Sequence, residues 1–499
     1  MDLTHRRELL ELIAGLAPGL GAAEHESRDE QTFLKNFLPL PDHRRSLEPD
    51  ILLILGGRGA GKTELFRLLA FPQGLRALSA EQPQTLPFDP VKTSWIPGFG
   101  RTHTGSKAFP APELLSKHLG NADASTLRAF WLGLAVGRLL NAPEQNLNGG
   151  EWTTRLSPDV RNSLQETSLI SKWLPRSRSR LEEVNDALDK LDTALQQSDR
   201  WLFVIYDELD RLLPNYSQLS APIRELLALW LDRWRRWERI RPKIFLRKDL
   251  FREEFLAFPD ASKLRGHKVE ITWQTASLYR LLVKRMANAG DKIYNYFRRY
   301  ISAMTFRTTD ALGLLPDNKE AGFQALMETM IGPYMGANPQ KGITYRWIPN
   351  HLQDSSGQIA PRSFLKLFAL AAGTRRDKVD QLSGAALLRP TDLQGALMDT
   401  STDRIRELQE EYPWIEALKS SLKNLEVPVP RVQFLSALNR TRWGPEAERM
   451  LPDKSPASVF NYLTDIGVVE LRTDGRVNVP EIYLYGFKLK RRGGISRPK

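Results

Sequence analysis

The chain has 499 residues, of which 41% are hydrophobic and 26% charged, and both values are ordinary for a globular protein. This length exceeds what one hydrophobic core supports and predicts roughly two to four domains, while the lack of cysteine excludes disulfides, thiolate metal sites and cysteine nucleophiles. The formal net charge of +12 favours an anionic partner such as nucleic acid. No apolar run approaches the ~18 residues of a membrane span, so we expect a cytoplasmic protein without membrane attachment.

Residues 1–48 are predicted to form one amphipathic helix and a linker. Glu8 and Glu11 interrupt the apolar part of the N-terminus, which favours an amphipathic helix over a signal peptide. Pro39 and Pro41 bias the residues before them away from helix, so the linker should be extended where it enters the core.

Residues 51–63 read ILLILGGRGAGKT, an apolar strand followed by the pattern G-x-x-x-x-G-K-T. In this arrangement backbone N–H groups surround the β-phosphate, Lys62 reaches the β- and γ-phosphates, and the Thr63 hydroxyl ligates Mg²⁺. The helical spacing of Leu65, Leu68 and Leu69 supplies the helix that the motif requires. We expect ATP and Mg²⁺ as ligands, since no guanine-reading NKxD motif is visible. The predicted nucleotide contacts are Gly56, Gly57, Arg58, Gly59, Ala60, Gly61, Lys62, Thr63 and Glu64.

The next segments vary in how clearly they predict structure. Residues 91–95 read as a strand, residues 97–112 as a loop, and residues 124–140 as an apolar core helix. Residues 143–178 are rich in Asn, Ser and Arg and are expected to be an irregular, mobile insert. The stripe of apolar residues in 180–197 predicts a helix packed within its own domain rather than a partner coiled coil, because it is shorter than three heptads.

A second phosphate-related motif follows the continuous apolar run of residues 201–206, which is typical of a strand buried on both faces. Asp207 at its tip is a candidate Mg²⁺ ligand, and Glu208 is a candidate base that polarises the attacking water. Asp210 is interpreted as a helix-capping carboxylate rather than a catalytic group.

Basic and aromatic residues dominate the segment after this motif. The tryptophans of the helix predicted at 221–240 are interpreted as core rather than as a nucleic-acid surface. Arg247 follows the strand 243–246 and is either a γ-phosphate sensor or part of a structural ion pair. Lys263 and Arg265 precede the strand 269–272 and are candidates for an arginine finger that reaches a neighbouring subunit.

The periodicity turns helical from residue 275 to about residue 373. Helices at 277–289 and 361–372 are expected to bracket loops rich in Gly and Pro. Pro361 fits a helix start and places Arg362 in the first turn, where the helix dipole disfavours a cation. Arg362 therefore either contacts a phosphate or is an ordinary surface arginine.

The C-terminal part predicts a winged helix. Short helices are expected at 434–439, 443–450 and 456–465, followed by strands at 468–472 and 476–485 that Thr473, Asp474 and Gly475 join as a hairpin. Pro480 makes the second strand an edge strand. With the basic tail from Lys488, this module favours double-stranded DNA over protein docking. The fold class is thus α/β, a doubly wound parallel-sheet P-loop ATPase core with a helical lid and a C-terminal winged helix.

The sequence predicts five segments in chain order. They are an N-terminal helix and linker (1–48), an ATPase core (49–273) with a helical insertion at about 97–199, a helical lid (274–385), a helical connector (386–428) and a winged helix (429–499).

Taken together, GGRGAGKT, the DELD at 207–210, Arg247 and the Ala-Pro-Arg phrase that ends at Arg362 resemble the AAA+/STAND side of the P-loop ATPases. The DELDRL wording is similar to that of origin-recognition-type initiators. The long insertion and the arginine at 247 are closer to STAND-type and KAP-like ATPases of bacterial antiphage defence. The resemblance implies Walker A contacts at Lys62 and Thr63, a Walker B pair at Asp207 and Glu208, sensor 1 at Arg247 and sensor 2 at Arg362.

The resemblance favours an ATPase that acts as an oligomerising switch or scaffold in a defence-type system, with homo-oligomers and a separate effector protein. Two alternatives stay open. One is a DNA-binding ATPase of the initiator or loader type, and the other is a scaffold that binds nucleotide without turnover.

Overall fold

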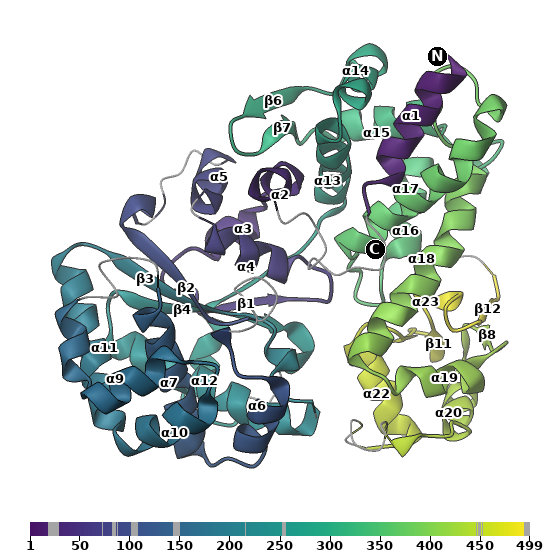
Figure 1. Ribbon diagram of the computed structural model, residues 1–499. Coiled ribbons are helices and arrows are strands. Elements are labelled where there is room, and N and C mark those ends of the chain that lie inside the picture. Colours follow the sequence, from purple (N-terminus) through teal and green to yellow (C-terminus); the bar gives the residue numbers. More distant parts are fainter. Residues whose placement is uncertain are drawn as a thin grey trace. The chain divides into compact units, whose positions relative to one another are not determined.

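Figure 1 shows a computed structural model of the chain, which describes all residues except 18–28, 72, 82–85, 87, 101–107, 143–149, 215, 252–255, 446, 448–450, 452 and 494–499. The chain divides into two compact units, residues 39–271 and residues 1–38 with 272–499. Across the described helices, none has both the length and the apolar character needed to cross a bilayer.

The unit of residues 39–271 is built on a five-stranded parallel sheet with the order β2-β3-β4-β1-β5. Its strands are β1 (Leu53–Gly56), β2 (Thr93–Phe99), β3 (Trp201–Tyr206), β4 (Ile240–Arg247) and β5 (Lys268–Glu270). β4 separates the P-loop strand β1 from β3, the strand that ends in the acidic motif. All five strands expected from the sequence are present, which confirms the α/β, doubly wound parallel-sheet class.

Helices cover both faces of this sheet (Figure 1). They are α3 (Pro41–Arg45), α4 (Lys62–Ala70), α5 (Gly74–Glu81), α6 (Pro112–Leu119), α7 (Ala124–Leu140), α9 (Pro158–Gln165), α10 (Ile170–Ser179), α11 (Leu181–Gln197) and α12 (Tyr216–Arg236). Alternate strand residues point to opposite faces: Leu53 and Leu55 join the core formed with α7, α11 and α12, whereas Phe245 meets Phe66 of α4 edge to face. α11 therefore packs within its own unit, as expected.

The expectation of an irregular insert is wrong for residues 150–178; residues 143–149 lie outside the described part. This segment forms a 3₁₀ turn (Glu151–Arg155), α9 and α10. Its few apolar residues are deeply buried, among them Leu164 and Trp173. α7 lets these helices approach closely, because a Cβ at Gly133 would lie 2.6 Å from Ser177 Oγ and one at Gly137 2.6 Å from the Leu164 carbonyl oxygen. The sequence of this segment did not predict these helices, because most of its residues are polar.

The tryptophans of α12 and the turn after it confirm the core interpretation. Trp230 and Trp237 are buried and meet edge to face, and Trp234 lies against the ring of His267. α12 ends at Arg236 rather than at residue 240, because β4 already begins at Ile240.

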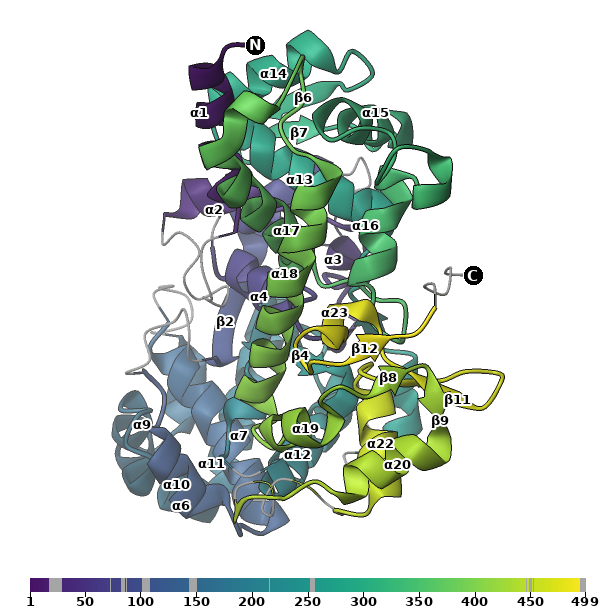
Figure 2. The same cartoon turned by 90° about the vertical axis from the view of Figure 1, so that its right-hand side faces the viewer.

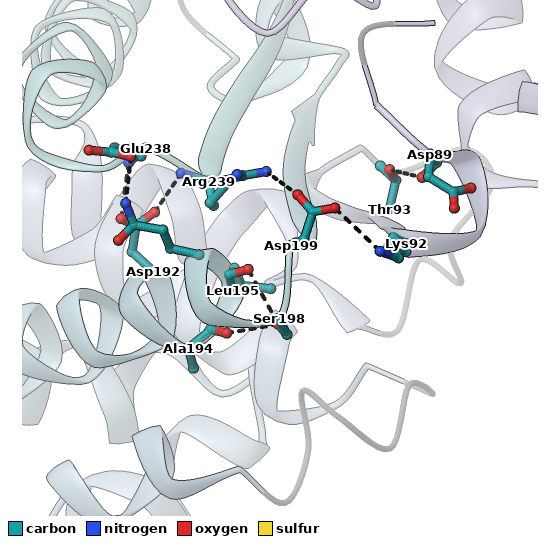
Figure 3. Close-up of polar contacts among 11 residues, drawn as sticks. Asp89, Lys92, Thr93, Asp192, Ala194, Leu195, Ser198, Asp199, Glu238 and Arg239 are labelled. Atoms are coloured by element: carbon teal, nitrogen blue, oxygen red, sulfur yellow. Dashed lines mark hydrogen bonds and ion pairs between the residues drawn. The ribbon is translucent and has the colours of Figure 1, made fainter.

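Figure 3 shows a carboxylate network at the start of β3 and β4. The buried Asp192 of α11 accepts hydrogen bonds from the backbone N–H groups of Glu238, Arg239 and Ile240, at 3.0, 2.8 and 2.9 Å. Asp199 bridges Lys92 and Arg239 at 3.3 and 3.2 Å. Asp199 thus links the segments ahead of β2, β3 and β4. Asp192 of α11 binds the backbone at the start of β4 and so fixes where that strand begins.

Replacing Asp192 with alanine should lower the free energy of unfolding by about 3 kcal/mol, because three backbone donors lose a charged acceptor in a buried place. Urea unfolding followed by circular dichroism measures this change. Asp186→Ala is the matched control, since this α11 carboxylate is largely exposed and meets Arg155 only at 3.6 Å. Equal midpoints for both variants would contradict the role given to Asp192.

Burial of His43 on α3 predicts a pH-dependent stability. His43 Nδ1 accepts from the Leu40 N–H at 3.2 Å, and burial lowers its pKa from 6.5 to about 3. The unfolded chain therefore takes up a proton below pH 6.5 that the folded chain refuses, and stability falls as the pH decreases toward 3. Between pH 7 and pH 5 the loss should be about 2 kcal/mol.

The measurement for His43 is urea unfolding at both pH values for the wild type and His43→Gln, whose side-chain oxygen can still accept from Leu40. His5→Gln is the control, because His5 is exposed at the other end of the N-terminal segment. The wild type and the His5 variant should lose stability in parallel, and the His43 variant should lose less. Three parallel profiles would show that His43 is protonated in the folded protein.

The second unit contains more elements than the sequence predicts. Its helices ahead of the C-terminal module are α1 (Leu3–Ala14), α2 (Glu30–Asn36), α13 (Thr275–Asn288), α14 (Asp291–Tyr300), α15 (Glu320–Met330), α16 (Thr344–Leu352), α17 (Pro361–Arg375) and α18 (Pro390–Glu411). A hairpin of β6 (Phe306–Thr309) and β7 (Gly313–Pro316) lies between α14 and α15. The expected Gly- and Pro-rich loops between the helices at 277–289 and 361–372 are therefore wrong.

The described part of residues 1–48 forms α1, α2 and α3 rather than one helix and a linker. α1 packs along α17 (Figure 2), and the buried Arg6 fastens it by donating to the carbonyl oxygens of Leu382 and Gly384, both at 3.0 Å. The finer domain boundaries expected from the sequence stay predictions.

The C-terminal module has the topology of a winged helix (Figure 2). Its elements are α19 (Ile415–Leu422), β8 (Glu426–Val427), β9 (Val429–Pro430), α20 (Arg431–Asn439), α22 (Pro456–Asp465), β10 (Glu470–Leu471), β11 (Arg476–Asn478), α23 (Glu481–Leu484) and β12 (Lys490–Arg491). The antiparallel sheet has the order β10-β11-β9, and Ser455 caps α22 as expected. The expected strand 476–485 is wrong beyond residue 478, because Pro480 is the N-cap of α23. Half of the helix expected at 443–450, residues 446 and 448–450, falls outside the described residues.

Candidate nucleotide-binding site

The glycine-rich loop joins β1 to α4 as the sequence predicts. Gly61 is the N-cap of α4 with a φ of 94°, a left-handed conformation that favours glycine. A Cβ at Gly56 would lie 3.1 Å from Ala60 Cβ and 3.3 Å from Lys62 Cγ, so the loop closes tightly on itself. The first turn of α4, with Lys62, Thr63 and Glu64, therefore begins directly after the loop, and its N–H groups face the loop.

Lys62 lies across the loop. Its Nζ donates to the carbonyl oxygens of Gly56 and Gly57, both at 3.0 Å. Both of these acceptors are neutral and belong to the same loop. Phosphate oxygens, which are negatively charged, are stronger acceptors for a cation. Arg58, at the tip of the loop, is partly exposed.

The two phosphate motifs meet at Thr63 and Asp207. The Thr63 hydroxyl hydrogen-bonds the Asp207 carboxylate, and the Asp207 N–H donates to the Phe99 carbonyl oxygen at 2.9 Å. Burial, followed by the nearby Glu208, raises the pKa of Asp207 from 3.8 to about 7. Its Oδ2 is buried and has no hydrogen-bond partner in the described structure. A buried carboxylate oxygen without a partner is costly and fits a bound cation.

Glu208 adopts an uncommon backbone conformation. Its φ of 56° and ψ of 31° are left-handed, which costs a non-glycine residue about 1 kcal/mol or more. The carboxylate is 8% exposed and lies 3.4 Å from Arg211 NH1. The strained residue lies two positions after the end of β3 and turns the chain into a 3₁₀ turn (Leu209–Arg211), which sets the direction of its side chain at the tip of the sheet.

Arg247 lies beside the P-loop, since it is the register partner of Gly56 on β4. Its guanidinium donates to Asp249 at 3.0 and 2.6 Å and to Asp210 at 3.3 Å. The structural ion pair is therefore present, and a γ-phosphate sensor role stays a prediction. Among the described residues no helix cap by Asp210 is seen: the 3₁₀ turn has Glu208 as its N-cap, and the Asp210 carboxylate pairs with Arg247.

The other candidate cations each have a carboxylate partner or a solvent-exposed position of their own. Lys263 and Arg265 are exposed on a 3₁₀ turn (Ala261–Arg265), and Lys263 pairs with Asp260 at 3.0 Å. In the other unit, Arg362 follows Pro361 at the start of α17, and its NH1 lies 3.5 Å from Glu407 Oε1. Their roles as finger and sensor stay predictions.

Sequence reasoning missed two participants. Asp249 anchors Arg247, and its only signal was a carboxylate two residues after the strand-tip arginine. Phe99 ends β2 and fixes the backbone of Asp207, a role that belongs to a main-chain carbonyl and leaves no side-chain pattern to read.

No protein-family model matches the chain. Over 339 residues it is 26% identical to the "Putative transposon gamma-delta 80.3 kDa protein" of Escherichia coli (strain K12), an alignment that covers 61% of this chain and 47% of that protein. The chain thus spans about half the length of the curated relative that it matches.

Three solved archaeal structures are similar over most of the chain. They are the Aeropyrum pernix ORC2 protein in ADPNP and ADP complexes (TM-score 0.37, 16% identity, 92% of this chain and 94% of that one), Cdc6p from Pyrobaculum aerophilum (0.29, 14%, 92% and 96%) and the Aeropyrum pernix ORC1 protein in complex with DNA (0.32, 13%, 90% and 93%). At these scores the overlap is loose, and the fold assignment rests on the strand order and register given above.

Proposed function

We propose that the chain binds ATP with Mg²⁺ and hydrolyses it. The observation that carries this proposal is the contact of Thr63 with Asp207, which joins the two phosphate motifs and leaves Asp207 Oδ2 without a partner. The strand order supports it. β1, β4 and β3 are adjacent parallel strands, so the P-loop, Arg247 and the acidic motif follow the carboxyl ends of neighbouring strands.

The donor set fits Mg²⁺. Thr63 and Asp207 offer two hard oxygen ligands, and Mg²⁺ usually takes its remaining ligands from substrate phosphates and water. When bound, this ion neutralises charge on the phosphate oxygens. Lys62 would exchange its two carbonyl acceptors for the β- and γ-phosphates, the N–H groups of the loop would orient them, and Glu208 would hold the attacking water.

We further infer a DNA-binding ATPase of the initiator or loader type. The winged helix supports this inference, because its exposed cations could meet a phosphate backbone; those around α20 and the hairpin are Arg431, Arg440, Arg442 and Arg476. The printed name of the E. coli relative, a transposon protein, is compatible with work on DNA. The relatives add nothing in favour of a defence-type switch, so homo-oligomers and a separate effector stay predictions.

Fluorescence anisotropy with a labelled DNA duplex, in ATP and at several salt concentrations, tests the DNA-binding proposal. Affinity should fall steeply with salt, and Arg440→Gln with Arg442→Gln should reduce the slope of log K against log salt by about one per arginine. Arg406→Gln, an exposed arginine of α18, is the control. No binding at low salt would refute DNA binding, and ATP binding without turnover would favour the scaffold alternative.

A further inference from the structure

The helical layer formed by the insertion contains a cavity of about 480 Å³ between the ends of α7, α9 and the start of α10. This volume is within the range of small-molecule sites. Polar side chains dominate the wall: Arg138, Asn141, Gln165, Glu166, Ser168 and Lys172. It lies outside the P-loop, and neither phosphate motif contributes to it.

Arg138 is the central cation of this cavity. Its Nε donates to the Pro97 carbonyl oxygen at 3.1 Å, and its guanidinium lies 4.9 Å from the ring centroid of Phe109. These contacts fix the plane of the guanidinium and use one of its five N–H donors. Burial lowers its pKa, and no carboxylate of the described residues pairs with it. A half-buried cation without a counter-charge is unfavourable, so an anion in the cavity would stabilise it.

The other residues that line the cavity also favour an anionic ligand. Lys172 and Glu166 neutralise each other at 2.9 Å, which leaves Arg138 as the net charge. Ser168 and Leu169 place the first turn of α10 in the wall, and no side chain caps that helix, so its N–H groups favour an anion. The Asn141 amide donates to the carbonyl oxygens of Gly137 and Gln165, and its own oxygen stays available to accept from a polar ligand.

We propose that this cavity binds a phosphate-bearing small molecule, with its phosphate on Arg138 and the start of α10. The site is connected to the sheet through Arg138, which donates a hydrogen bond to Pro97 of β2. Two residues later on β2, the Phe99 carbonyl oxygen accepts a hydrogen bond from the Asp207 N–H. A ligand on Arg138 would therefore stiffen the strand end that supports the acidic motif. The proposal goes beyond ATP turnover and does not depend on it.

Isothermal titration with inorganic phosphate tests this site in the full chain that carries Lys62→Ala, so that binding at the P-loop is suppressed. Adding Arg138→Gln should weaken phosphate binding by about tenfold or more, since charge-assisted donors to the anion are lost. Adding Arg161→Gln, an arginine of α9 that does not line the cavity, should leave the affinity unchanged.

Lys172→Gln keeps the test decisive if Arg138→Gln does not fold. Lys172 is exposed, and its loss frees Glu166 to oppose the anion, so phosphate affinity should fall severalfold. Circular dichroism checks the folding of each variant. Absence of phosphate binding in the Lys62→Ala protein, or equal affinity with and without Lys172→Gln, would overturn the proposal.

Discussion

Lys62→Ala is expected to abolish measurable ATP binding, with a loss of affinity of about 100-fold or more. The Lys62 ammonium group lies across the loop, and the carbonyl oxygens of Gly56 and Gly57 that it contacts are neutral. On binding, the same group would meet two negatively charged phosphates, and charge-assisted hydrogen bonds of this kind are worth about 1.5–3 kcal/mol each. Equilibrium binding of a fluorescent ATP analogue measures the loss.

The control for Lys62 is Lys190→Ala, which removes an exposed lysine of α11 that meets Glu151 at 3.7 Å. This variant should bind ATP like the wild type. Retention of wild-type affinity by Lys62→Ala would show that the loop is not the phosphate cradle, and the assignment of the site would fail. Because alanine removes only a side chain outside the core, both variants should unfold like the wild type.

The fold of the unit of residues 39–271 is predictable from the sequence because its strands are continuous apolar runs. Residues 201–206 match β3 at both ends, since Trp201–Tyr206 is followed at once by charged residues. The helical layer of residues 150–178 is not predictable by the same rule. Its apolar residues are few, and what holds the layer is the close approach of α9 and α10 to two glycines of α7.

The part of the candidate site that is predictable from the sequence consists of residues that occupy fixed positions in a local sequence motif. The positions of Lys62, Thr63 and Asp207 follow from glycine spacing and from the end of an apolar strand. The state of Arg247 does not follow, because a strand-tip arginine reads the same whether it meets a phosphate or the carboxylates of Asp210 and Asp249. The position of Arg138 was also not predictable from the sequence, because what distinguishes it is that no carboxylate among the described residues pairs with it.

Glu208→Gln is expected to bind ATP with wild-type affinity and to hydrolyse it about 10²–10⁴-fold more slowly. Glutamine keeps the size of the side chain but cannot accept the proton of the attacking water, and a positioned general base contributes a factor of this size. The left-handed backbone at residue 208 should persist, because it is set by the turn from β3 into Leu209–Arg211 and not by the charge. Steady-state phosphate release and analogue binding separate the two effects.

The matched control is Glu182→Gln, which alters an exposed carboxylate in the first turn of α11 and should keep full turnover. Arg211 gives a second check, because its NH1 lies 3.4 Å from the Glu208 carboxylate and helps to orient it. Arg211→Gln should therefore lower turnover while leaving ATP affinity unchanged. If Glu208→Gln retains wild-type turnover, another group activates the water, and the strained conformation of residue 208 serves the turn alone.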